Sequence, residues 1–313
     1  MNALRSGARF VRDLVGDFLG DDCPRMAAAL SYYTVFAVPP LLGLLALLAS
    51  RFVDPEQLQA LIVEQVESVV GVDSAAQIVE VVQGVVRPRF DGPTAVLALL
   101  ALVFGATGAF VQLQDALNAA WGVRPDPRRG DVLTFLVKRG VSLLMILSFG
   151  VLLFASVLAS TAISVVRGFL SDVAPPWMLG VGLPLADLGI SLLAVTVLFT
   201  LVLRYVPDAV VRWRDALVGG ILTGLLFTAG KLLIGYYLAR SQPGSVYGAA
   251  GSLVIGLIWI YYSAIILLLG AEFTGAWACR HGEEVTPQRG AVRVRRQVVY
   301  ADGTDRGQDV RAA

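Results

Sequence analysis

The sequence is poor in the residues with which most enzymes build active sites. It contains one histidine, His281, and two cysteines, Cys23 and Cys279, among 313 residues. It has no HExxH, CxxC, GxSxG or GxxxxGKS/T pattern, so the usual signatures of metal hydrolases, dithiol redox proteins, serine hydrolases and P-loop proteins are missing. These absences predict no catalytic residues, no metal and no other cofactor, and therefore a protein that is not an enzyme.

Charged residues are also scarce. Only 16% of the chain is charged, 56% is hydrophobic, and the mean hydropathy is +0.71. A soluble domain of this length carries more charge than that, so the composition excludes the soluble class and indicates a membrane protein.

Six apolar stretches are long enough to cross a bilayer, whose hydrocarbon core of about 30 Å needs roughly 20 helical residues. The uncharged stretches are 26–50, 92–114, 140–166 and 241–271, and those that admit a charge are 187–204 and 216–239. We therefore predict an all-α polytopic membrane protein, a bundle of six transmembrane helices with amphipathic surface helices.

The basic residues indicate the orientation. Four precede the first span, five lie in the second loop, three in the fourth loop and seven in the tail, which makes 19, whereas the opposite side has five. By the positive-inside rule, both termini are cytoplasmic. Cys23 and Cys279 then lie near the cytoplasmic ends of two spans, where a reducing compartment disfavours a disulfide, so we expect free thiols.

The chain divides into three segments. Residues 1–25 form a cytoplasmic segment in which Phe10, Leu14 and Phe18 recur at helical spacing, which predicts an amphipathic helix on the membrane surface. Residues 26–279 form the transmembrane domain, with an outer helical loop at about 52–92. Residues 280–313 are arginine-rich and polar, and we expect this cytoplasmic tail to be disordered.

Ionisable residues inside spans are the first functional candidates, because a charge at the centre of a span costs about 2.5 to 3.5 kcal/mol on insertion scales. Asp187 lies 17 residues before Arg204. Lys231 lies 17 residues after Arg214, so both candidates stand about 26 Å from those arginines. On two antiparallel helices, Asp187 and Lys231 are expected to meet at one depth and pair.

Small residues on the fifth span bear on the direction of that lysine. Gly220 and Gly224 share a face with Lys231, and the Gly-x-x-x-Gly spacing permits close helix packing, which would turn Lys231 inward. The alternative is that Lys231 snorkels to the outer interface on its long stem.

A second polar group gathers at the cytoplasmic end of the second span. Gln112, Asp115 and Asn118 lie there, and Glu272 of the last span reaches a similar depth. These residues could line a cytoplasmic vestibule, although a membrane interface normally carries polar residues as well.

Two further features concern the first and last spans. Pro39 and Pro40 remove amide donors near the middle of the first span, which predicts a kink and a hinge. Tyr261 and Tyr262 lie about 14 Å into the last span from Ser252, too deep for an interfacial belt unless their hydroxyl groups find partners.

Four ordered segments resemble the YihY/BrkB family of bacterial inner-membrane proteins, whose members have often carried the label ribonuclease BN. The segments are AAALSYYT at 27–34, which runs on to Pro39-Pro40, LNAAWG at 117–122, VYGAAGSL at 246–253 and GAEFT at 270–274. The resemblance implies six helices and cytoplasmic termini in a bacterial inner membrane. Proposals for the family include export of envelope lipids or solutes and serum resistance. The ribonuclease label implies a histidine-rich metallo-hydrolase, which a chain with one histidine does not fit.

The leading functional hypothesis is a transporter or flippase-like exporter of an anionic lipid or small amphiphile. The alternative is a scaffold that organises the envelope without transport, and a membrane-associated nuclease comes third. The expected partners are membrane lipids, with anionic head groups at the basic cytoplasmic face, and no nucleic acid. Association into oligomers stays open.

Overall fold

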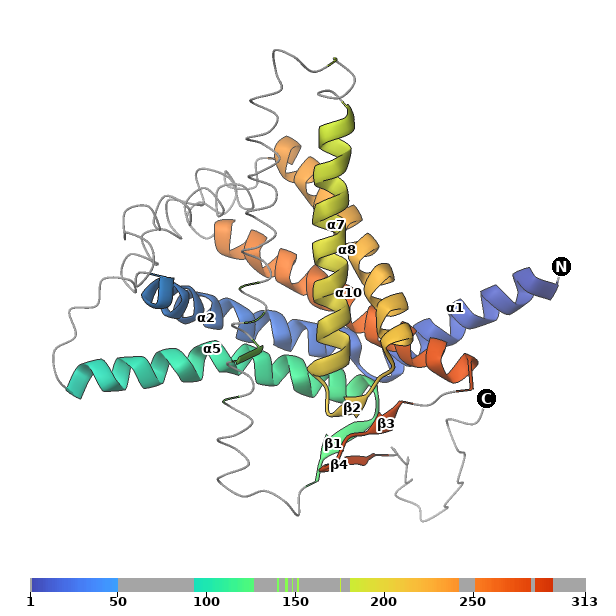
Figure 1. Cartoon of the computed structure of the whole chain (residues 1–313), viewed down its shortest axis with the longest axis horizontal. Coiled ribbons are helices and arrows are strands. Elements are labelled where there is room, and N and C mark those ends of the chain that lie inside the picture. Colours follow the sequence, from blue (N-terminus) through green and yellow to red (C-terminus); the bar gives the residue numbers. More distant parts are fainter. Residues whose placement is uncertain are drawn as a thin grey trace.

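The computed structural model describes residues 2–49, 93–126, 181–241, 251–282 and 285–294, with a few single positions between 140 and 175. This part of the chain is mainly helical (Figure 1). In chain order, its elements are α1 (Asn2–Gly20), α2 (Cys23–Ala49), α5 (Pro93–Ala120), β1 (Val123–Pro125), α7 (Leu183–Tyr205), β2 (Ala209–Val210), α8 (Trp213–Ser241), α10 (Gly251–Arg280), β3 (Thr286–Pro287) and β4 (Ala291–Arg293).

Three of the described helices are long and apolar enough to cross a membrane. They are the segments Leu183–Tyr205, Trp213–Ile234 and Gly256–Arg280. Two more predicted spans coincide with α2 and α5, which are helical over 23–49 and 93–120. The predicted span at 140–166 lies almost wholly outside the described residues, as does the outer loop at 52–92. The structure therefore shows a helical protein with three candidate spans, and the count of six stays a prediction.

Local sequence explains where several helices begin and end. α7 has a proline in its first two positions, Pro184, where a missing amide hydrogen costs nothing. α8 carries Asp215 in its first turn, where a carboxylate complements the helix dipole. α10 ends at Arg280 and is followed by Gly282 with φ of 77°, a left-handed conformation that glycine adopts without strain. α2 is helical through Pro39 and Pro40, and the hinge there stays a prediction.

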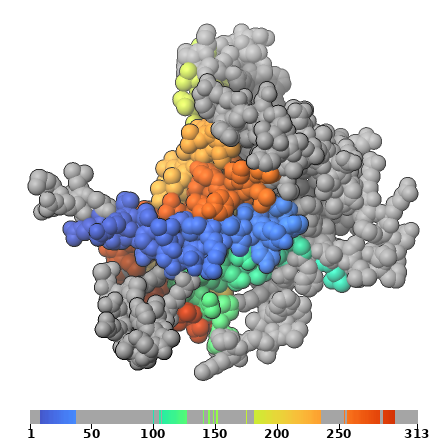
Figure 2. Space-filling model, turned by 180° about the vertical axis from the view of Figure 1, so that it is seen from behind, coloured from blue at the N-terminus to red at the C-terminus, as the bar shows by residue number. Residues whose placement is uncertain are grey.

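Two helical hairpins flank a central helix. α2 packs along α5, α7 packs along α8, and α10 contacts both α2 and α8. Figure 2 shows α2 lying between α10 and α5 on one face of the molecule. The hairpins diverge from a common region beside the four short strands (Figure 1), which we call the ribbon end because β1–β4 lie there.

The N-terminal helix uses its apolar stripe differently from the prediction. Phe10, Leu14 and Phe18 were expected to face the membrane surface, but Leu14 is buried and Phe10 makes an edge contact with Phe273 of α10, with ring centroids 5.8 Å apart. This stripe therefore packs against the protein. A second stripe, made of Val11, Val15 and Leu19, is exposed instead.

Glycine and threonine residues set the distance between α8 and its two neighbours. Gly220 lies against Thr200 of α7, and Gly224 lies one turn further along against Thr196. A methyl group added at Gly224 would stand 2.6 Å from the Thr196 hydroxyl oxygen and 3.3 Å from its Cα. The Gly-x-x-x-Gly face of α8 is thus in close contact with α7.

The opposite side of α8 forms a reciprocal arrangement with α10. Gly219 of α8 lies against Thr274 of α10, and Gly270 of α10 lies against Thr223 of α8. Both threonine hydroxyls are buried and donate to the carbonyl four residues earlier, Thr223 to Gly219 O and Thr274 to Gly270 O, each at 2.7 Å. Each helix therefore supplies one glycine and one self-satisfied threonine to the same contact.

This reciprocity predicts a compensating pair of substitutions. Gly270→Ala should destabilise the detergent-solubilised protein by about 1 to 3 kcal/mol, because the new methyl group overlaps the Thr223 hydroxyl. Adding Thr223→Ala should recover part of this loss, because it removes the Thr223 hydroxyl with which the new methyl group overlaps. Thermal unfolding measures both effects. Gly189→Ala is the matched control because nothing lies within 4 Å of its added methyl group. Additive losses from Gly270→Ala and Thr223→Ala would contradict the contact.

Candidate functional site

The tail segment 285–294 joins two loops at the ribbon end. β4 pairs antiparallel with β1 after α5, with Arg124 opposite Val292, and β3 pairs with β2 between α7 and α8, with Ala209 opposite Pro287. This part of the tail is therefore ordered by strand pairing, and the prediction of a disordered tail from residue 280 is wrong there. Residues 295–313 lie outside the described part of the chain.

Asn118 connects α5 to the loop that follows α7. Its side-chain nitrogen donates to Asp208 Oδ2 at 3.0 Å, and its side-chain oxygen accepts from the Asp208 backbone N–H at 2.7 Å. Asn118 is only 2% exposed, and the Asp208 carbonyl accepts a further bond from the Gln288 backbone N–H of the tail at 2.9 Å. The two residues thus link three segments that are far apart in sequence.

Trp121 and Cys23 make two more polar contacts with α10. The Trp121 indole N–H donates to Ala271 O at 2.8 Å, and the ring packs against Gly275. The Cys23 thiol, fully buried, donates to Glu272 Oε1 at 3.6 Å. Burial, and after it the neighbouring Glu272 carboxylate, raises the pKa of the Cys23 thiol far above its ordinary value. Cys23 is therefore a neutral thiol.

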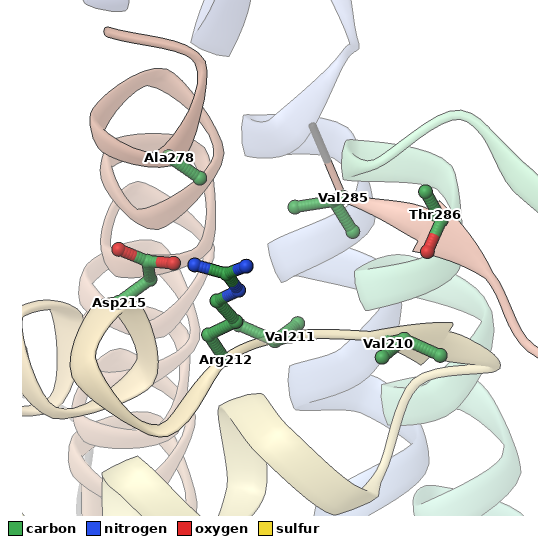
Figure 3. A pocket seen from close by; sticks show the side chains of 7 residues that line it. All are labelled: Val210, Val211, Arg212, Asp215, Ala278, Val285 and Thr286. Atoms are coloured by element: carbon green, nitrogen blue, oxygen red, sulfur yellow. The ribbon is translucent and has the colours of Figure 1, made fainter. Parts of the chain in front are cut away.

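A pocket of about 290 Å³ opens beside these contacts (Figure 3). Its lining residues come from β2, the start of α8, the end of α10 and β3. They are Val210, Val211, Arg212, Asp215, Ala278, Val285 and Thr286. The Arg212 and Asp215 side chains point toward one another across it in Figure 3, while Val285 and Ala278 supply apolar wall. Asp215 is 8% exposed and Arg212 is exposed. The pocket can therefore offer a cation, an anion and apolar surface to one small molecule.

The structure brings only some of the predicted polar group together. Asn118 and Glu272 are both buried at the ribbon end but serve different partners, Asp208 and Cys23. Gln112 is half-buried, and Asp115 is exposed. A vestibule lined by all four residues stays a prediction.

The predicted pair within the spans does not form. Lys231 is exposed, and the Asp187 Oδ1 atom is buried without a hydrogen-bond partner in the described structure. No ion pair joins these two residues, so the prediction that they meet and turn the lysine inward is wrong. The exposure of Lys231 fits the alternative, a lysine that snorkels along the helix surface.

The two deep tyrosines behave differently from each other. The Tyr262 hydroxyl donates to Leu226 O of α8 at 3.1 Å, and its ring lies against Gly230. Tyr261 is 37% exposed. The Tyr262 hydroxyl therefore has the hydrogen-bond partner that its depth in the span requires, and the bond joins α10 to α8.

Sequence reasoning missed the residues of the pocket and the acceptor of Asn118. Asp215 had a usable signal, an acidic residue in the first turn after a basic loop. Asp208 follows a proline in a short connection. Nothing in the local sequence indicated its role, which depends on the tertiary contact with Asn118. Thr286 and Val285 lie in a segment whose composition gave no sign of strands.

The fold and its apolar helices define a helical membrane protein. The chain belongs to the family described as Virulence factor BrkB, whose model matches residues 14–295. Among its relatives, an UPF0761 membrane protein of Pseudomonas aeruginosa (strain LESB58) is 36% identical over 278 aligned positions, and the alignment covers 85% of this chain and 62% of that protein. The UPF0761 membrane protein of Alkalilimnicola ehrlichii is 34% identical over 324 aligned positions, gaps included, and the alignment covers 99% of this chain and 68% of that protein.

A relative in Azotobacter vinelandii, also named an UPF0761 membrane protein, is 33% identical over 266 residues, 84% of this chain and 62% of its own length. This chain thus spans about three fifths of the Pseudomonas and Azotobacter relatives. No solved structure gives a significant match.

The environments of the two cysteines predict opposite reactivities. In folded protein in detergent, N-ethylmaleimide should modify the exposed Cys279 and leave the buried Cys23 untouched until the protein is unfolded. Because the folded-state pKa of Cys23 lies above its unfolded value of 9.0, the thiol is neutral in both states below about pH 9. Above that pH the unfolded chain alone releases the proton, so stability should fall. Mass spectrometry after timed labelling measures the reactivities.

Glu272→Gln separates the two causes of the Cys23 shift. It removes the neighbouring charge but not the burial, so Cys23 should stay protected in the folded variant. Equal labelling rates for Cys23 and Cys279 in the folded wild-type protein would contradict the buried environment.

Proposed function

We propose that this chain is a bacterial inner-membrane protein with six spans and both termini in the cytoplasm. The support is the division of its basic residues, 19 against five, together with helices at five of the six predicted spans. In this orientation the ribbon end, with its pocket, faces the cytoplasm.

Accessibility of two introduced cysteines tests the orientation. Ser74→Cys and Gly303→Cys, each in a background of Cys23→Ala and Cys279→Ala, place one thiol in the predicted outer loop and one in the tail. A membrane-impermeant maleimide added to intact cells should label only the outer-loop variant, and permeabilised cells should label both. Labelling of the tail variant on intact cells would overturn the topology.

We further propose that the protein exports an anionic lipid or small amphiphile and has no enzymatic activity. The pocket at Arg212 and Asp215 carries this proposal, because it joins a guanidinium to apolar walls at the end of the bundle where export would begin. A guanidinium binds phosphate or carboxylate through charge-assisted hydrogen bonds, and apolar walls accept a hydrocarbon chain. The basic cytoplasmic surface would concentrate such anions there.

Transport by purified protein tests this function. Proteoliposomes should move labelled anionic lipids or organic anions outward, and Arg212→Gln should slow this movement by about tenfold through loss of charge-assisted bonds. Arg214→Gln is the matched control. It makes the same change of charge at a nearby exposed residue that does not line the pocket. Equal slowing by both variants would remove the pocket from the mechanism.

Polar contacts between segments of the chain favour a second candidate, a scaffold without transport. Three residues that the sequence analysis predicted to line a transport pathway instead contact another segment of the chain. They are Asn118, Glu272 and Tyr262. A protein that only organises its surroundings needs such polar residues for packing alone. Absence of flux for a broad panel of anionic lipids and amphiphiles, with folded protein in both orientations, would favour the scaffold.

A further inference from the structure

Arg204 lies beside two aromatic rings at the end of α7. Its guanidinium carbon is 4.6 Å from the centroid of the Trp213 ring and 5.6 Å from that of Tyr205. The two rings meet edge to face, with centroids 5.9 Å apart and an angle of 80° between their planes. Tyr205 is the last residue of α7 and Trp213 the first of α8, so the turn between the helices brings the three side chains together.

The guanidinium has hydrogen-bond capacity that the described structure does not use. Its Nη1 atom donates to Val211 O, and its Nε atom is buried without an acceptor. An arginine has five N–H donors in one plane, and a buried donor without an acceptor costs about 1 to 3 kcal/mol. The Nη2 atom makes no hydrogen bond with a described residue, and the N–H groups of a guanidinium lie in its plane, which is the geometry with which arginine binds a phosphate.

Both rings are half-exposed at the end of an apolar helix. Tyr205 is 49% exposed and Trp213 is 51% exposed, and α7 is one of the candidate spans. Tryptophan and tyrosine at the end of a span stand at the height of the lipid head groups. The guanidinium of Arg204 is thus held at the level where phospholipid phosphates lie. The exposed Arg212 and Arg214 follow in the connection to α8 and in its first turn.

We propose that Arg204, Tyr205 and Trp213 form a binding site for the phosphate of an anionic phospholipid in the adjacent leaflet. The phosphate accepts from the guanidinium edge, and the rings hold the guanidinium in place and contact the glycerol region. An anionic lipid is favoured over a zwitterionic one because Arg204 is positively charged and two exposed arginines, Arg212 and Arg214, follow it within ten residues. The site depends on the membrane embedding of α7, and it does not depend on export.

The test is lipid-dependent thermal stability of the full-length protein in detergent. Increasing phosphatidylglycerol should raise the melting temperature to a plateau, which gives an apparent Kd, and phosphatidylcholine should raise it much less. Arg204→Gln should weaken the apparent Kd by about tenfold, the loss expected for charge-assisted hydrogen bonds. Arg204→Lys should weaken it severalfold, since an ammonium keeps the charge but lacks the planar edge.

Matched variants distinguish a specific lipid-binding site from general electrostatic attraction to anionic lipid. Arg214→Gln removes the same charge from an exposed position in the first turn of α8 and should change the apparent Kd by less than about twofold. Trp213→Leu keeps an apolar side chain in a residue that is already half-exposed, and should weaken binding severalfold even if Arg204→Gln does not fold.

Three outcomes would overturn the proposal. Equal losses for Arg204→Gln and Arg214→Gln would show general electrostatic attraction. Equal stabilisation by phosphatidylcholine would show that the charge is not recognised. Equal stabilisation by inorganic phosphate at the same concentration would assign the site to a free anion. None of these measurements involves flux, so export can fail while the site stands.

Discussion

The close approach of α8 to both of its neighbours is the contact on which the rest of the bundle depends. Two consecutive glycines of this helix face different neighbours, Gly219 lying against Thr274 of α10 and Gly220 against Thr200 of α7. In a bilayer the lipid tails are as apolar as the side chains, so helices associate through dense packing and not through the hydrophobic effect. Glycine allows that density because backbone atoms then meet across the contact. The hydroxyls of Thr200, Thr223 and Thr274 donate within their own helices, so these three buried groups are satisfied without a partner across the contact.

Polar residues in the membrane region therefore have two separate uses in this protein. Thr223 and Thr274 pack, and Asn118 and Trp121 fasten the ribbon end through bonds to Asp208 and Ala271. A buried polar group is costly unless it is bonded, so a residue of this kind by itself does not indicate a substrate path. Better candidates for ligand binding are polar atoms that have no hydrogen-bond partner in the described structure or that face a pocket.

Patterns that depend on one helix were readable from the sequence, and those that depend on tertiary contacts were not. Apolar length predicted the positions of α2, α5, α7, α8 and α10, and the spacing of Gly220 and Gly224 predicted a close helix contact. Equal depth predicted that Asp187 and Lys231 would pair, but depth does not fix the angle around each helix axis. The structure leaves Lys231 exposed and the Asp187 oxygen without a partner.

The tail is a second case in which tertiary contacts, and not local sequence, determine the structure. Composition predicted disorder for a polar, arginine-rich segment, but strand pairing needs only partners with free backbone groups. The loops after α5 and α7 provide them, and β3 and β4 form on these partners. Arg293 adds a bond from Nη2 to Val285 O at 2.9 Å within the tail itself.

These contacts restrict how the bundle can change shape. The tail strands bind one loop of each hairpin, and Asn118 with Asp208 joins the same two hairpins directly. The three helices α7, α8 and α10 share dense glycine–threonine contacts and would move together, since tightly packed interfaces resist sliding. Any separation of α2 and α5 from that unit must then be smallest at the ribbon end, where the links lie, and largest at the opposite end. If the protein exports a substrate as proposed, its cycle would keep the links at the ribbon end and open at the opposite end, unless the tail strands were first released.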